Sequence, residues 1–192
     1  MVEVFQQKPA INQKAENQLN TLKDNIIREL TRHAPLLPPD TDTTKGQLVR
    51  GENNKGFPYL SLDIPQKFSK TEMFTYRTLF WWGHYLGFSL ILKGEKLPDY
   101  LHNLLALRGS SAWANVYVAT ASTPWEWEQN ETNFLNVSRA TDEEIQQAIH
   151  TIQYIKLCRF HSMQDENFCD LDWTQAGMDS WQLLSSIAYI QD

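Results

Sequence analysis

Two side chains in the middle of the chain have the chemistry to bind and act on a small anion. Arg77 lies in a run of apolar, β-prone residues, and a guanidinium can hold a carboxylate or phosphate through two parallel hydrogen bonds. His84 follows at a predicted turn, and imidazole can carry a proton near neutral pH. Asp63 and Ser61 precede both on a predicted strand, where a carboxylate could orient the histidine. This set is the basis for one of two functional hypotheses, the alternative to a binding role: an enzyme that acts on a small anionic metabolite, with Arg77 as anion clamp and His84 as proton carrier.

Arg77 also has a structural interpretation. A buried guanidinium without a counter-charge costs on the order of several kcal/mol, so a carboxylate must lie beside it if it is buried. Asp63 and Glu52 are the nearest candidates on the preceding predicted strands. We favour this internal ion pair, and the anion-binding arginine is the functional alternative.

A metal site is the third chemistry to weigh. Cys158, His161 and Cys169 could donate ligands, with His150 earlier on a predicted helix. The spacing lacks the paired CxxC or HxxxH that is typical of zinc sites. Two cysteines in a reducing compartment are more often small buried residues. We therefore expect no metal and no other cofactor.

One short stretch resembles a carrier-protein signature. The residues 177–180, Gly-Met-Asp-Ser, resemble the phosphopantetheine attachment site of acyl carrier proteins, although Trp181 stands where that family has leucine. The resemblance covers these residues alone. The alternative, which we expect, is that Asp179 caps a terminal helix over about 179–190.

The chain contains no catalytic motif, so a non-catalytic role is the favoured prediction. There is no GxSxG, HExxH, glycine-rich phosphate loop or DxDxDG sequence. Aromatic residues make up 12% of the chain, and rings supply both burial and contact surface. We expect a binding or interaction protein whose ligand is a small anion or another protein. Its candidate binding residues are Arg77, His84, Asp63, Trp81, Trp82, Trp125 and Trp127.

The charge distribution limits the kinds of partner that the protein can bind. The formal net charge is −6, and residues 97–192 hold 13 acidic but only 4 basic side chains. Such a half repels nucleic acid and anionic lipid. The longest nearly apolar run, 79–92, is too short and too interrupted to span a membrane, and no secretory signal precedes it. We expect a cytoplasmic protein that binds neither nucleic acid nor membranes.

The element that must position Arg77 and His84 is a hairpin over 71–93. Gly83 and His84 suit a two-residue turn, which pairs Trp82 with Tyr85 and Arg77 with Leu90. That register leaves Arg77 on an otherwise aliphatic face. A bulged turn would shift the register by one residue and move Arg77 to the other face.

The remaining pattern predicts a single α+β domain over 1–192, with an antiparallel sheet of about five strands and helices packed against it. An amphipathic helix over 11–34 precedes a β-meander over 46–93, whose second strand ends at Pro65. The part from 97 to 192 contains a helix opened by Pro98, a strand at 114–119, an acidic loop at 122–132 and C-terminal helices.

Trp125 and Trp127 in that loop either cap the core, which we favour, or form a recognition surface. A capping box at Thr141 to Glu144 opens a helix that runs towards Cys158. The first helix or the tryptophan loop could also build a homodimer.

Overall fold

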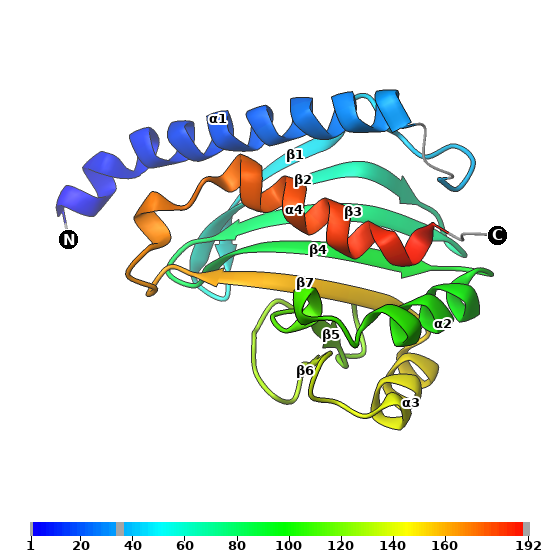
Figure 1. Ribbon diagram of the computed structural model, residues 1–192. Coiled ribbons are helices and arrows are strands. Elements are labelled where there is room, and N and C mark those ends of the chain that lie inside the picture. Colours follow the sequence, from blue (N-terminus) through cyan, green and yellow to red (C-terminus); the bar gives the residue numbers. More distant parts are fainter. Residues whose placement is uncertain (1, 34–36, 190–192) are drawn as a thin grey trace.

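A seven-stranded antiparallel sheet in the order β1-β2-β3-β4-β7-β5-β6 forms the centre of the computed structural model, which describes residues 2–33 and 37–189 (Figure 1). Helices α1 and α4 lie on one face of the sheet. The strands are β1 (Gln47–Asn54), β2 (Phe57–Phe68), β3 (Met73–Trp81), β4 (Tyr85–Lys93), β5 (Tyr117–Ala119), β6 (Phe134–Asn136) and β7 (Ile155–Ser162). The α-helices are α1 (Val2–His33), α2 (Leu97–Leu107), α3 (Asp142–Ile152) and α4 (Trp173–Ser185).

The predicted α+β architecture is confirmed, and the sheet is larger than predicted. Strands β1 to β4 form the expected meander. The two strands that the prediction omitted are β6 and β7. Strand β2 also continues beyond Pro65 to Phe68, with a register shift between Asp63 and Gln66 where it pairs with β3. The predicted strand at 114–119 is shorter, since β5 starts at Tyr117.

Helix α1 packs on the sheet through the stripe that its spacing predicts. The stripe residues are all buried within the chain: Ala15, Leu19, Leu22, Ile26 and Leu30. Because the sheet already covers this stripe, it is not free to join a second copy. The helix starts earlier than predicted, and residue 34, its predicted end, lies outside the described residues.

The central hairpin has a three-residue loop, so the predicted register is wrong by one residue. Trp81 pairs with Tyr85, and Arg77 pairs with Ser89 instead of Leu90. The loop closes when His84 N–H donates to the Trp81 carbonyl at 3.1 Å. Gly83 has φ +72°, a left-handed conformation that glycine adopts without steric cost.

This register sorts the side chains into two chemically different faces. The helix face, towards α1 and α4, collects the buried side chains Phe74, Tyr76, Phe80, Leu86, Phe88, Leu90 and Leu92. The opposite side, here called the loop face, collects Asp63, Thr75, Arg77, Ser89 and Lys156 with several aromatic residues. Arg77 therefore lies among polar neighbours and not on the aliphatic face.

Two predictions in the C-terminal part are wrong at element boundaries. Helix α3 has its capping box at Thr141 and Glu144 as predicted, but it ends at Ile152 because Gln153 takes a left-handed conformation with φ +60°. Strand β7 follows at once, so the stretch up to Cys158 is not helical. Helix α4 starts at Trp173 with Asp172 as its cap, and Asp179 is inside the helix. Ile190, the expected end of that last element, lies outside the described residues.

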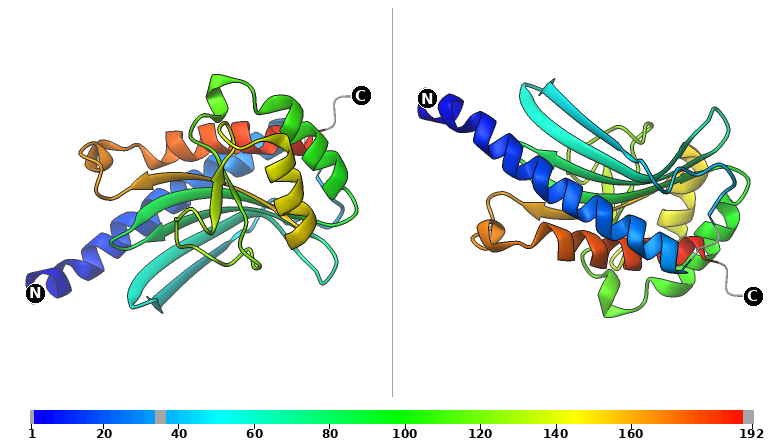
Figure 2. Two further views of the ribbon diagram at one scale, coloured as in Figure 1. Left: turned by 90° about the horizontal axis from the view of Figure 1, so that it is seen from below. Right: turned by 90° about the horizontal axis from the view of Figure 1, so that it is seen from above.

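Helix α4 packs tightly against α1 at Gly177. A side chain added there would meet the Leu22 methyl groups at 2.6 Å, so only glycine leaves room for α1 at this point. The Tyr76 hydroxyl also donates to the Gly177 carbonyl at 2.6 Å. From this contact the two helices diverge towards their N-terminal ends, as the right-hand view of Figure 2 shows.

Candidate functional site

A loop that contains two tryptophans covers part of the loop face. We call residues 122–132 the Trp loop. Trp127 is buried against Leu79, Trp81 and Tyr85, and the Tyr85 hydroxyl donates to the Trp127 carbonyl at 2.6 Å. Trp125 remains 41% exposed. The predicted core-capping role is therefore confirmed for Trp127, whereas Trp125 presents one side to solvent.

Arg77 and Asp63 form the internal ion pair that the sequence predicts. The guanidinium donates from Nε to Asp63 Oδ1 and from a terminal nitrogen to Oδ2, both at 2.8 Å. Thr75 donates to the same carboxylate at 3.1 Å. The other candidate, Glu52, contacts Lys8 and Arg50 on the surface. The Arg77 guanidinium lies 4.5 Å from the ring centroid of Trp125, so Trp125 covers the pair by a cation–π contact.

Lys156 is the second cation on the loop face. Its ammonium donates to the carbonyls of Pro124 and Glu126 at 2.8 and 2.7 Å, and these residues belong to the Trp loop. The side chain is only 5% exposed. No carboxylate of the described residues forms an ion pair with it. Burial lowers the pKa of this amine, because the charged form loses its hydration.

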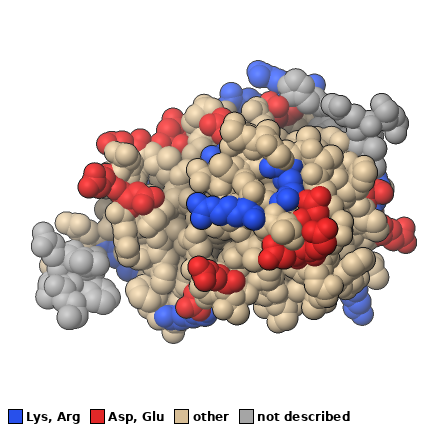
Figure 3. Space-filling model, turned by 60° about the horizontal axis from the view of Figure 1, so that its bottom comes forward, with Lys and Arg blue, Asp and Glu red and all other residues tan. Residues whose placement is uncertain are grey.

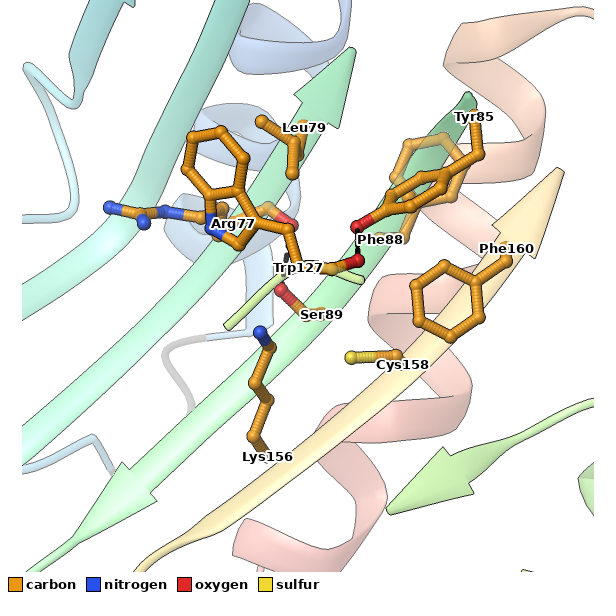
Figure 4. A pocket seen from close by; sticks show the side chains of 10 residues that line it. Arg77, Leu79, Tyr85, Phe88, Ser89, Trp127, Lys156, Cys158 and Phe160 are labelled. Carbon is orange, nitrogen blue, oxygen red and sulfur yellow. Dashed lines mark hydrogen bonds between the residues drawn. The ribbon is translucent and has the colours of Figure 1, made fainter. Parts of the chain in front are cut away.

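A small cavity lies beside Lys156, under the Trp loop (Figure 4). Lys156, Cys158 and Ser89 point towards the same space, and the Arg77 guanidinium points away from it. The cavity volume is about 10 Å³, which is room for about one water molecule. Burial raises the pKa of the Cys158 thiol to about 11, so this thiol is not an activated nucleophile at neutral pH.

The structure does not bring His84 to Arg77 and Asp63. His84 stacks on Trp81 with ring centroids 3.6 Å apart, and its Nε2 is buried without a hydrogen-bond partner. Trp81 is four positions beyond Arg77 on β3, a separation of about 13 Å along a strand. Ser61 lies on β2 opposite Leu79. Trp82 packs against the core on the helix face, away from the other tryptophans of the candidate set.

The residues weighed for metal binding and for carrier chemistry lie apart or buried. Cys158 faces the loop side of β7, His161 contacts Phe88 on the helix face, and Cys169 is exposed after the strand. No group of three or more potential ligand side chains gathers anywhere in residues 2–33 and 37–189. Ser180 is fully buried and bonds to the Ala176 carbonyl, so its hydroxyl is not accessible for attachment of a prosthetic group.

Lys156 is the site residue that the sequence interpretation missed. The sequence pattern predicts a helix that runs towards Cys158 and includes this position, and on a helix surface a lysine is an ordinary solvated side chain. The alternation of apolar Ile155 and Leu157 with Lys156 and Cys158 was the available signal for a strand. The pairing of that strand with β4 and the Trp loop over its loop side together bury the lysine.

The surface over this site carries charges of both signs. In Figure 3, which turns the loop side towards the viewer, basic and acidic side chains lie next to one another, with no broad patch of one sign. Among the described residues no helix is both long and apolar enough to cross a bilayer. No protein family, curated protein or solved structure matches this chain.

Proposed function

We propose that the protein binds a small anionic ligand between the loop face and the Trp loop. The observation that carries this proposal is the Lys156 ammonium, which is buried beside a cavity and meets two carbonyls but no carboxylate of residues 2–33 and 37–189. A carboxylate or phosphate group of the ligand is the partner that this cation lacks.

The charge balance of the site supports an anion. Asp63 compensates Arg77 through two hydrogen bonds, which leaves the Lys156 charge in surplus on the buried face. Carbonyl dipoles satisfy two of the three ammonium protons. A buried charge without a counter-charge is unfavourable by several kcal/mol as an order of magnitude, so an anion that binds there gains the energy of completing the pair.

Arg77 has a supporting role in this proposal. Two of its nitrogens are already occupied by Asp63, and Trp125 covers its face. It fixes the floor next to the ligand site and holds Trp125 in place. Lys156 therefore takes the role of anion partner that the sequence first suggested for Arg77.

Ligand entry requires the Trp loop to move. The cavity now has space for about one water molecule, and the loop lies directly over it. Hydrogen bonds from Tyr85, Tyr154 and Lys156 tie carbonyls of residues 121–127 to the sheet, and Lys55 bonds to Glu126 and Glu128. These ties are few and polar, so a ligand anion can replace those made by Lys156.

The enzyme alternative has less support. It requires Arg77 and His84 to contact one substrate, yet the two residues have separate surroundings at different points along the hairpin. A binding role needs only the Lys156 site. We therefore do not propose a reaction.

Thermal unfolding in a panel of phosphate, sulfate and small carboxylates tests the proposal. At least one anion is expected to raise the melting temperature of the native protein, because a ligand that binds only the folded state stabilises it by mass action. The same anion is expected to have no effect on Lys156→Met.

A second variant separates loss of charge from loss of loop anchoring. Tyr85→Phe removes one loop hydrogen bond but keeps the ammonium, so it should retain the anion effect. The proposal fails if no anion stabilises the native protein, or if Lys156→Met responds as the native protein does.

A further inference from the structure

A second hollow lies on the helix face, far from the Trp loop in the fold. Because α1 and α4 diverge from Gly177 (Figure 2), the sheet between their N-terminal parts is not covered by either helix. A hollow of about 340 Å³ remains there, within the range of small-molecule sites. It is thus much larger than the cavity beside Lys156.

The hollow, here called the helix groove, has mostly apolar walls. The lining side chains come from α1 (Ile11, Ala15), β3 (Phe80), the segment between β7 and α4 (Met163, Phe168) and the first residue of α4, Trp173. Ile11 is 37% exposed, which is unusual for an isoleucine of a helix face turned towards the protein. The positions from Ile11 to Gln18 extend for about 10 Å along the helix, so the groove is elongated.

The charge of the groove comes from one residue. Lys14 is the one Lys, Arg, Asp or Glu residue among the lining residues. In the described part of the chain it forms no ion pair. The nearby carboxylates of Asp165 and Glu166 line a separate hollow with His161, which shares only Phe168 and Leu171 with the groove. An apolar slot with a single cation at its rim is complementary to an aliphatic chain that ends in a carboxylate.

We infer that the helix groove binds a medium-chain aliphatic carboxylate, with the chain between the helices and the head group at Lys14. Burial of the chain supplies most of the affinity, because the transfer of each methylene group from water to an apolar wall is favourable. Lys14 supplies selectivity for an acid over the matching alcohol. This site is independent of Lys156 and of the ligand proposed for the Trp loop.

Octanoate and 1-octanol are suitable probes, and Cys169 gives a local readout. Cys169 lines the groove and is exposed, whereas Cys158 is buried. Octanoate is expected to slow alkylation of Cys169 in native protein, measured by peptide mass spectrometry. In Lys14→Met the octanoate concentration for half-protection should rise roughly two- to fivefold, the effect of an exposed ion pair, with 1-octanol unchanged.

Two further variants make the result decisive. Lys23→Met is the matched control, since it removes a lysine from the same helix at a position outside the groove, and it should protect like native protein. Ile11→Glu should abolish protection by both probes, because it puts a carboxylate at the mouth. Failure of octanoate to protect Cys169 in native protein overturns the inference, as does equal weakening by Lys14→Met and Lys23→Met. Neither result bears on the Lys156 site.

Discussion

Asp63 and Arg77 lie directly opposite each other on β2 and β3, and their side chains meet through two hydrogen bonds of 2.8 Å. The Asp63 side chain is 1% exposed and the Arg77 side chain 15%. Charges so deeply placed do not stabilise a fold simply by attracting each other, since both lose their hydration. Instead, each buried charge requires the other as its counter-charge, because either one alone would be unpaired.

Removal of one member of this pair should be costly. Asp63→Asn leaves the guanidinium without a counter-charge, and we expect a loss of about 3 kcal/mol in the free energy of unfolding, measured with urea. The double variant Asp63→Asn with Arg77→Met should regain more than half of this loss. A single-variant loss below about 1 kcal/mol, the range of exposed pairs, contradicts the interpretation.

The two cysteines should differ strongly in reactivity. Iodoacetamide at pH 8 should modify exposed Cys169 and leave Cys158 intact, because burial raises the pKa of the Cys158 thiol to about 11. Tyr85→Phe, which releases the Trp loop from one tie, should increase modification of Cys158 alone. If Cys158 reacts as fast as Cys169 in native protein, the loop does not cover it as described.

Asp42 should make stability depend on acid pH. Partial burial opposes its ionisation, but hydrogen bonds from the backbone of Lys45, Thr44 and Gly46 and from Gln66 outweigh this and lower the pKa from 3.8 to about 2. The stabilisation is therefore complete above about pH 4 and is lost as the pH falls towards 2. We expect it to be roughly 1 kcal/mol, because solvent screens a partly exposed carboxylate.

Asp42→Asn provides the corresponding measurement. Unfolding by urea at pH 7 and at pH 2.5 should give a smaller difference in stability for this variant than for native protein. An unchanged difference would assign the acid sensitivity to other carboxylates.

Replacement of Gly177 in α4 should destabilise the packing of α4 on α1. Gly177→Val forces α1 away from α4 at Leu22, and overpacking of this kind costs about 1 to 3 kcal/mol. Gly109→Ala is the control, because an added carbon there meets no atom within 4 Å. Thermal unfolding compares the two, and equal melting temperatures would rule out close packing at Gly177.

Local signals in the sequence were sufficient for much of the fold. The apolar stripe from Ala15 to Leu30 and the capping box at Thr141 are properties of short segments, and the structure contains both. The Asp63 partner of Arg77 was also predictable, since an arginine in an apolar strand requires a nearby carboxylate. These features do not depend on distant parts of the chain.

The missed features depend on long-range pairing. Ile155 continues the helical spacing of α3, and only Gln153 and the pairing of β7 with β4 assign it to a strand. That error hid Lys156. Aspartate is a common helix cap, so Asp179 was a reasonable candidate, yet the cap of α4 is Asp172, about two helical turns earlier. In both cases the local sequence allowed two structures, helix or strand at Ile155 and a cap at Asp172 or Asp179, and contacts with the rest of the protein select one of them.

The turn at residues 82–84 has an odd number of residues, and this odd number determines which side chains of β4 face α1 and α4 and which face the Trp loop. Deletion of one loop residue would exchange the two sides of the strand, so Leu86, Phe88 and Leu90 would trade places with Tyr85, Gly87 and Ser89. A deletion or insertion of two residues would leave the sides as they are. Length variation at this turn is therefore tolerable only in steps of two, whichever amino acids it contains.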